Sequence, residues 1–591
     1  MPQSGALETT DRRFPGQPRL DPPVTELCRR QQDSAALAVI IICFASIALA
    51  ALVLARDGNL EWDDAQYYEQ ALRVVRVASQ SSTPVTTWFN ELLSMQPKPP
   101  LYSAWLTLGI VLLTNSVPAA ILIWGTIPLF AAVCGSIFYI SSRLRPSPSG
   151  FISLLLYWGC PVAIAIAAKL MVETLLSLTI LWYLFALASL CSKPRIHYAV
   201  VAGIALGAGL LTKLSFVGFA ITPSLMTAFF ISRSHGIRIA ATSLIPLVIT
   251  TAMIAGPWYA MNGEAAAKFA QLSSHFMDLV GGPSYPIYQR LLAITVISVG
   301  PLVTLWWIAQ IFNVERRTNN CVIDLPSQAS RNCLREQSAL TSRYFAFLTL
   351  AATVIPLLSL MQTNHFETRF YSPISPALSI VASLWLFDRR ASMSFRLWRA
   401  CQWGVAGSIL LTLGWIATEH TSKTDWKLAG AIDQLENDHV FSIGVIGDTY
   451  NLNSNKLALF NELTSNPTKR VFANYSGCFN PKDWQNSLVN LDAVIVVDEI
   501  DPYLEKIAPN LNIYRAEGCR LIAPSARDEN DTRAPISRWR EIRNDELQIN
   551  KARLFIRENS QSTSTSSRAP WAKFTAYPYS RSVRSESERS A

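Results

Sequence analysis

The chain has 591 residues, of which 50% are hydrophobic and 16% are charged. Soluble globular domains carry about a quarter charged residues, so these totals exclude an ordinary soluble protein and favour an integral membrane protein. The formal net charge is +9, which we attribute to basic residues in cytoplasmic loops and in the C-terminal tail. No nucleic-acid-binding motif accompanies this charge, so we expect no nucleic-acid partner.

The N-terminal residues 1–34 are polar, contain proline and carry several arginines, and we expect a disordered cytoplasmic arm. The apolar run 35–55 is long enough to span a bilayer. We expect an uncleaved anchor, because the polar segment before it is longer than that of a signal peptide. The arginines ahead of the run place the N-terminus in the cytoplasm and residues 56–100 outside.

The next apolar run, 101–114, is about 21 Å long as a helix, which is shorter than the roughly 30 Å hydrocarbon core. We therefore expect an interfacial or re-entrant helix there. Ten full spans are predicted after it, at about 117–141, 150–168, 172–191, 197–213, 215–232, 237–256, 290–311, 343–361, 371–388 and 396–416.

Basic pairs between these spans test the topology. Strict alternation puts five such pairs on the cytoplasmic side, as the positive-inside rule requires. The pairs are Arg143/Arg145, Lys193/Arg195, Arg233/Arg238, Arg316/Arg317 and Arg389/Arg390. The sequence thus predicts a polytopic α-helical membrane protein of about 11 spans, with 12–13 as alternatives, in which 35–416 form the membrane domain.

Residues 425–525 lose the long apolar runs and alternate short β-type and helix-type segments. This alternation predicts a small α/β domain on the outer side of the membrane. Gly444 and Gly447 do not complete a nucleotide-binding fingerprint, and Cys478 and Cys519 are the one cysteine pair in this region for which a disulfide is an option. The remaining residues, 526–591, are rich in Ser, Arg and Glu, and we expect a disordered tail.

The outer segment 56–100 holds the first candidate site residues. Asp63 and Asp64 stand in the first turn of an expected helix, where acids suit the helix dipole. Neighbouring residues point in different directions on a helix, so the two acids should not share one proton. One of them can serve as a general base, whereas capping and solubility are the structural alternative. Tyr67 lies on the same helix.

Lys98 precedes Pro99 and Pro100 at the entry to the next helix. Pro99 restricts Lys98 to an extended conformation, and the prolines stiffen the entry. An ammonium would therefore be held at the level of the lipid headgroups. It can bind a phosphate, or it can simply be a snorkelling lysine.

Further candidates lie at the outer ends of later spans. Glu173 needs a partner at that depth, for which Lys169 one turn earlier is an obvious choice, whereas Lys213 is better explained as an anchor. Trp258 and Tyr259 open an expected outer loop, 257–289, as an aromatic belt or as a wall for sugar or lipid.

Arg369 follows an outer loop and can bind a phosphate bidentately, with Tyr371 beside it. His275 and His365 lie on separate loops and indicate a metal site only weakly, so we predict no metal ligands.

Taken in order, these motifs resemble those of the type C glycosyltransferase superfamily, in the branch of protein O-mannosyltransferases and lipid A aminoarabinose transferases. The matching motifs are Asp63-Asp64-Ala65-Gln66-Tyr67, Lys98-Pro99-Pro100-Leu101, Glu173, Leu211-Thr212-Lys213, Pro257-Trp258-Tyr259 and Arg369-Phe370-Tyr371.

The resemblance implies that Asp63 is the catalytic carboxylate and that Lys98 and Arg369 hold the phosphate of a lipid-linked sugar. Asp64 stands where the family has glutamate, so its assignment as a second catalytic acid is less direct. A glutamate before the lysine helps to bind zinc in the aminoarabinose enzymes. Pro97 takes that place in this chain, so no cofactor is carried over, although a divalent metal remains an option.

The residues fit this chemistry independently of the resemblance. A sugar phosphate is a good leaving group when cations stabilise the departing charge, so one base and a Lys/Arg clamp suffice. We therefore expect transfer of one sugar, with inversion, from a polyprenyl phosphate to a lipid, glycan or protein acceptor on the outer face of a bacterial inner membrane. The alternatives are a lipid-linked sugar transporter or flippase and a glycan polymerase or ligase.

Overall fold

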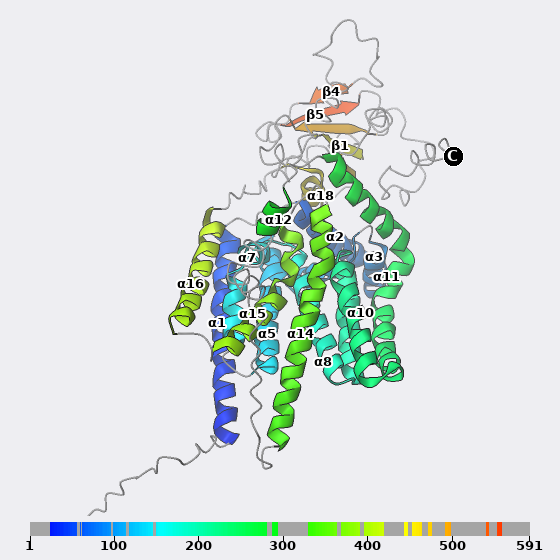
Figure 1. The fold of residues 1–591 in the computed structure, drawn as a ribbon. Helices are drawn as coiled ribbons and strands as arrows, with labels where there is room; N and C mark the ends of the chain where they lie inside the picture. The colour runs from blue at the N-terminus through cyan, green and yellow to red at the C-terminus, as the bar shows by residue number, and fades with distance from the viewer. Residues whose placement is uncertain are drawn as a thin grey trace, which may run out of the picture.

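The structure is a computed structural model, and it describes residues 24–55, 60, 62–95, 98–113, 118–145, 149–280, 286–293, 329–362, 368–390, 395–418, 442–446, 452–463, 471–474, 491–497, 539–542 and 552–557. Most of them form an α-helical bundle, and a small sheet lies beyond one end of it (Figure 1).

The long apolar runs of the sequence form the helices of the bundle. Within the described residues, six helices are long and apolar enough to cross a membrane, or seven if one bent pair counts as a span. The bundle consists of α1 (Val24–Ala55), α5 (Pro118–Leu144), α6 (Ser149–Trp158), α7 (Pro161–Ala167), α8 (Glu173–Ser192), α9 (Ile196–Thr212), α10 (Phe216–His235), α11 (Ile237–Val280), α12 (Ile287–Ala293), α14 (Ala329–Gln362), α15 (Ser375–Arg390) and α16 (Phe395–Thr418).

Helix α8 lies at the centre of this bundle and packs against α5, α9, α10, α14 and α15. In its most apolar stretch of 18 residues, 83% are buried inside the protein, a larger share than in any other candidate span among the described helices. A helix that is apolar on all faces is expected to be buried on all faces. The N-terminus of α8 is therefore an interior position, and Glu173 begins the helix there.

The predicted single span 150–168 is bent in the structure. Helices α6 and α7 meet at 80°, with the break at Gly159 and Cys160. Pro161 begins α7 and cannot donate a backbone hydrogen bond. At the break, the Gly159 carbonyl accepts a hydrogen bond from Ser408 Oγ of α16 at 2.6 Å, so a neighbouring helix supplies a partner where the helix is interrupted.

The outer loop expected from residue 257 is helical instead. Helix α11 runs without interruption from Ile237 to Val280 and contains Pro246 and Pro257. The prediction ended the span at Gly256-Pro257 because both residues disfavour helix interiors in water. Packed membrane helices tolerate both, since neighbouring groups satisfy the freed backbone.

Three shorter helices lie at the end of the bundle that faces the sheet. They are α2 (Trp62–Ser79), α3 (Pro84–Ser94) and α4 (Leu101–Leu113), which pack as α2 on α3 and α2 on α4. Trp105 of α4 stacks on Trp124 of α5 at 4.7 Å between ring centroids, which ties α4 to the bundle. Helix α4 has 13 residues, in line with its expected shortness.

The sheet has five strands in the order β2-β1-β3-β5-β4. Strands β1 (Ser442–Ile446), β2 (Val471–Asn474) and β3 (Ala493–Val497) are parallel, whereas β5 (Ala552–Arg557) and β4 (Trp539–Ile542) run antiparallel. Helix α18 (Ser454–Leu463) connects β1 to β2 and also packs against α2 (Figure 1).

Strands β4 and β5 correct the expectation that 526–591 is a disordered tail. Ala552–Arg557 pair with β3, and Trp539–Ile542 pair with β5, so the α/β unit extends well past residue 525. Both strands are short and stand in a Ser-, Arg- and Glu-rich context, which hides their β pattern. The segments 483–489, 502–507 and 511–514 of the expected α/β domain, and the Cys478–Cys519 pair, lie outside the described residues.

Candidate active site

Asp63 stands in the first turn of α2, a helix held in place by buried contacts with α4. The Tyr67 ring meets the Tyr102 ring edge-on at 5.2 Å between centroids, and Ser103 Oγ donates to Gln70 Oε1 at 2.9 Å. Tyr67, Gln70, Tyr102 and Ser103 are all buried. This packing fixes α2 and so fixes where Asp63 lies.

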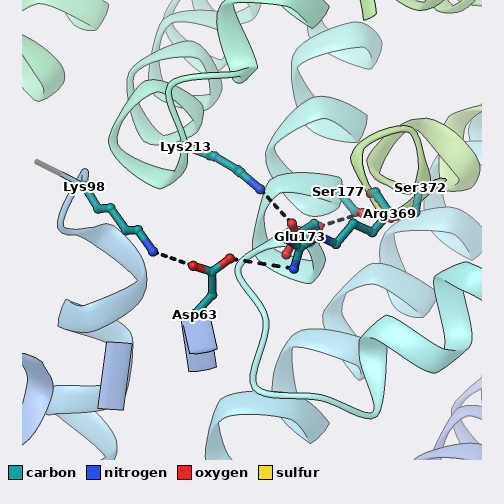
Figure 2. A network of polar contacts seen from close by, with 7 residues as sticks. All are labelled: Asp63, Lys98, Glu173, Ser177, Lys213, Arg369 and Ser372. Atoms are coloured by element: carbon teal, nitrogen blue, oxygen red, sulfur yellow. Dashed lines mark hydrogen bonds and ion pairs between the residues drawn. The ribbon is translucent and has the colours of Figure 1, made fainter. Parts of the chain in front are cut away.

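Asp63 lies between two cations from distant parts of the chain (Figure 2). Lys98 Nζ donates to Asp63 Oδ1 at 2.6 Å, and Arg369 Nη1 lies 3.7 Å from Asp63 Oδ2. The Asp63 side chain is 38% exposed, so one side of the carboxylate is open to an incoming group. The structure thus brings together the three residues that the sequence predicted for base and phosphate binding.

Two aromatic residues support the segment that carries Lys98. Lys98 Nζ lies 5.1 Å from the centroid of the Tyr67 ring, within cation–π range. Trp258 of α11 is buried and donates from Nε1 to the Met95 carbonyl at 3.1 Å, and Asn262 Nδ2 donates to the Leu93 carbonyl at 2.6 Å. The extension of α11 therefore holds the chain just before Lys98.

Trp258 and Tyr259 both hydrogen-bond the backbone of neighbouring segments. The Tyr259 hydroxyl donates to the Leu210 carbonyl at 3.1 Å, close to the end of α9. Both aromatic residues thus position neighbouring chain segments.

Arg369 lies in the short 3₁₀ helix η3 (Thr368–Phe370), which leads into η4 (Ser372–Ile374) and α15. Its backbone carbonyl accepts a hydrogen bond from Ser372 Oγ at 2.8 Å, and its guanidinium lies 5.1 Å from the Phe370 ring centroid. Tyr371 is buried and its hydroxyl lies near Thr353 of α14. Tyr371 thus anchors the turn that presents Arg369.

A second ion pair lies beside the first (Figure 2). Lys213 Nζ donates to Glu173 Oε1 at 2.7 Å, and the Glu173 side chain is only 4% exposed. Lys213 also lies 4.9 Å from the Phe370 ring centroid. The partner expected for Glu173 was Lys169, whereas the structure pairs Glu173 with Lys213. Lys213 caps the C-terminus of α9, in line with its expected place at a helix break.

Asp64 differs sharply from Asp63 in its surroundings. It is fully buried, within electrostatic range of the Tyr67 and Tyr102 hydroxyls. Adjacent residues on a helix were expected to point apart, and their exposures agree with that reasoning. A buried carboxyl is poorly placed to meet an acceptor, so Asp63 is the accessible acid.

Three cations lie around the carboxylates of Asp63 and Glu173. They are Lys98, Lys213 and Arg369. Burial raises the pKa of Asp63, but Lys98, Arg369 and Lys213 together hold that pKa well below its usual range. An anionic ligand is therefore electrostatically suited to this site.

Among the described residues, no group of three or more His, Cys, Asp or Glu side chains is placed to hold a metal ion. His365 and Glu367, and the side chain of His275, lie outside those residues.

Comparison with known proteins connects this geometry to a family. The model of the dolichyl-phosphate-mannose-protein mannosyltransferase family matches residues 97–259. That segment contains Lys98, Glu173 and Lys213, whereas Asp63 and Arg369 lie on either side of it. No curated protein sequence matches the chain.

Solved structures show the wider similarity. ArnT from Cupriavidus metallidurans bound to undecaprenyl phosphate aligns with a TM-score of 0.52 at 13% identity, covering 88% of this chain and 97% of that one. The apo state of ArnT aligns with a TM-score of 0.51 at 13% identity, covering 88% and 98%. The oligosaccharyltransferase of Archaeoglobus fulgidus in its apo form gives a TM-score of 0.44 at 11% identity, covering 78% of this chain and 69% of that one. The resemblance to type C membrane glycosyltransferases is thus confirmed, and the chain has the polytopic membrane fold of ArnT.

Proposed function

We propose that this protein transfers one sugar from a polyprenyl-phosphate donor to an acceptor hydroxyl at one membrane face. The observation that carries this proposal is the convergence of Asp63, Lys98 and Arg369 from three separate segments. The similarity to ArnT, described as bound to undecaprenyl phosphate, supports the class of donor.

Each residue has a defined role in a single displacement. The acceptor oxygen attacks the anomeric carbon, and Asp63 takes the hydroxyl proton. The bond from that carbon to the phosphate oxygen breaks, and Lys98 and Arg369 stabilise the negative charge that the leaving phosphate gains. Attack opposite the leaving group inverts the anomeric centre.

Glu173 and Lys213 complete the site from the protein interior. Glu173 neutralises Lys213 at 2.7 Å and keeps that ammonium next to the Phe370 ring. Through this pair, the N-terminus of α8 and the C-terminus of α9 are joined directly behind the phosphate-binding cations. Asp64, Tyr67, Trp258, Tyr259 and Tyr371 act by positioning the elements that carry the reacting groups.

Basic residues support the sidedness of this proposal. Ser338 and Ser342 of α14 donate to carbonyls of Arg143 and Leu144 at the end of α5, and Thr341 donates to Ser192 at the end of α8. These ends carry the basic pairs that the positive-inside rule assigns to the cytoplasm. Helix α2, which carries Asp63, and the sheet lie at the other end of the bundle (Figure 1), which we assign to the periplasmic side of a bacterial inner membrane.

The proposal is tested with purified protein in lipid nanodiscs. Polyprenyl-monophosphate hexoses and pentoses are supplied with lipid A, core saccharide, other glycans or peptide as acceptors, with and without a chelator of divalent metals. Acceptor-dependent loss of sugar from a monophosphate donor supports the proposal. Transfer only from oligosaccharide diphosphates indicates a polymerase or ligase, and movement of donor across vesicles without transfer indicates a flippase.

A further inference from the structure

The carboxylate assigned as base and the cations assigned to the donor phosphate bind one another. Lys98 Nζ makes a charge-assisted hydrogen bond of 2.6 Å with Asp63 Oδ1. Arg369 Nη1 lies 3.7 Å from the other oxygen, Oδ2, which is longer than the roughly 2.7–2.9 Å of a tight charge-assisted bond. Both oxygens of Asp63 thus face cations.

This arrangement opposes the proposed chemistry in two ways. A phosphate that binds Lys98 and Arg369 must compete with the negative charge already paired with them. A carboxylate stabilised by cations is also a weak base, because the same charges that favour its ionised form disfavour proton uptake. Phosphate binding removes both obstacles at once, since it draws the cations away from Asp63.

The neighbouring ion pair is built differently. Glu173 is 4% exposed and its partner Lys213 is 22% exposed, whereas the Asp63 side chain is 38% exposed. A buried carboxylate loses much more when its partner is withdrawn than an exposed one does. The Glu173–Lys213 pair is therefore the permanent one, and the Asp63 contacts are the ones that a ligand can displace.

We propose that Asp63 serves as an internal counter-anion of the donor site, which the donor phosphate displaces from Lys98 and Arg369, so that the base becomes available only after the donor has bound. This inference rests on the function proposed above. It predicts an ordered reaction in which the donor binds first. It also means that an acceptor alone meets a carboxylate engaged with cations, which protects the site from unproductive proton transfer.

The decisive test is the affinity for undecaprenyl phosphate, used as the probe in nanodiscs. Removing the competing charge with Asp63→Asn should tighten binding about tenfold, whereas Lys98→Ala should weaken it. Glu264→Gln removes an equal charge from an exposed position on α11, paired only with Lys268 in the described contacts, and should change nothing. Unchanged or weaker binding by Asp63→Asn overturns the inference.

If the Asn variant misfolds, Asp63→Ser removes the same charge and is expected to tighten binding in the same way, and failure to do so counts equally against the inference. The failure of the proposed function is seen separately. If wild-type protein transfers no sugar from any polyprenyl monophosphate, the function itself is wrong, whatever the binding data show. If transfer occurs without tighter binding by either Asp63 variant, only the counter-anion role is wrong.

A second measurement uses wild-type protein. The groups around Asp63 are Lys98, Lys213, Arg369, Glu173, Asp64, Tyr67 and Tyr102. If the donor withdraws Lys98 and Arg369, the acidic limb of kcat should lie at higher pH than the acidic limb of kcat/KM for the donor, because the first reports the donor complex and the second the free enzyme. Coincident limbs contradict the inference.

Discussion

A carboxylate contacts a cation at each end of α2, but the pKa values of the two carboxyl groups shift in opposite directions. At the N-terminal end, three cations outweigh burial and hold the pKa of Asp63 well below its usual range. At the other end, Arg76 meets Glu462 of α18 at 2.7 and 3.0 Å, but burial raises the pKa of Glu462 to about 7 despite Arg76, and Glu69 nearby adds to this.

One close cation therefore does not decide the charge of a buried carboxyl group. The N-terminal end places three cations near Asp63 and so suits an anionic ligand. The other end is a joint between α2 and the α/β unit, where Leu459 of α18 enters the core of the helical bundle. We expect the first end to govern catalysis and the second to govern stability.

The largest effect is expected for Asp63→Asn. Loss of a general base lowers the turnover number about 10²–10⁴-fold, while the protein still folds and still binds the donor, with the tighter affinity expected from the loss of the competing charge. Transfer assays with saturating donor, together with size-exclusion profiles, check this. Glu264→Gln is the matched control, and near-normal turnover by Asp63→Asn would remove Asp63 as the base.

Lys98→Ala should act mainly through the donor. Without the ammonium, the KM for polyprenyl-phosphate sugar should rise at least tenfold, and the turnover number should fall as well because the leaving phosphate loses a cation. Donor titrations at fixed acceptor measure both quantities. Lys268→Ala, at an exposed position on α11, controls for the loss of charge. An unchanged donor response would return Lys98 to a snorkelling role.

The joint at the other end should respond to apolar replacement. Arg76→Met or Glu462→Met alone leaves a charge buried without its partner, and each should lower the thermal unfolding midpoint by roughly 2–5 °C. The double variant should recover most of this loss, since both charges are gone. Tryptophan fluorescence in detergent measures the midpoints. Additive losses in the double variant would show that the pair is not coupled.

The smallest effect is the pH dependence of that joint. The pKa of Glu462 is raised from 4.5 to about 7 in the folded protein. Between these values the native state keeps a proton that the unfolded state has lost, so stability falls as pH rises from 4.5 to about 7. The midpoint should therefore decline over this range, and Glu462→Gln should remove that component. If the unfolding midpoint of Glu462→Gln declines with pH in the same way, the pH dependence comes from other groups.

Short motifs in the sequence place charged residues at the expected ends of helices, and these helix ends lie close together in the fold. Asp63, Lys98 and Arg369 were found this way. The Glu173–Lys213 pair was not predicted, because the two residues are 40 positions apart in the sequence, whereas Lys169 lies one turn from Glu173. The true partner comes from the end of α9, which only the packing of α8 against α9 brings near.

Other errors have equally local causes. Gly256-Pro257 signals a helix end in water, yet α11 continues through it, and the 80° break at Gly159 depends on a hydrogen bond from α16 that no sequence window contains. Strands β4 and β5 are short, and their identity comes from pairing with β3 rather than from composition. Helices α5 and α8 lie close to the spans predicted at 117–141 and 172–191, because length and hydropathy define them.

The length of α11 gives the membrane itself a part in the reaction. At about 1.5 Å per residue, its 44 residues measure roughly 66 Å, about twice the hydrocarbon core. The same helix spans the bilayer and holds the chain before Lys98 through Trp258 and Asn262. We expect tilting of α11 in a thinner bilayer to move Lys98 relative to the headgroups. Under the proposed function, acyl-chain length should therefore change the affinity for the donor.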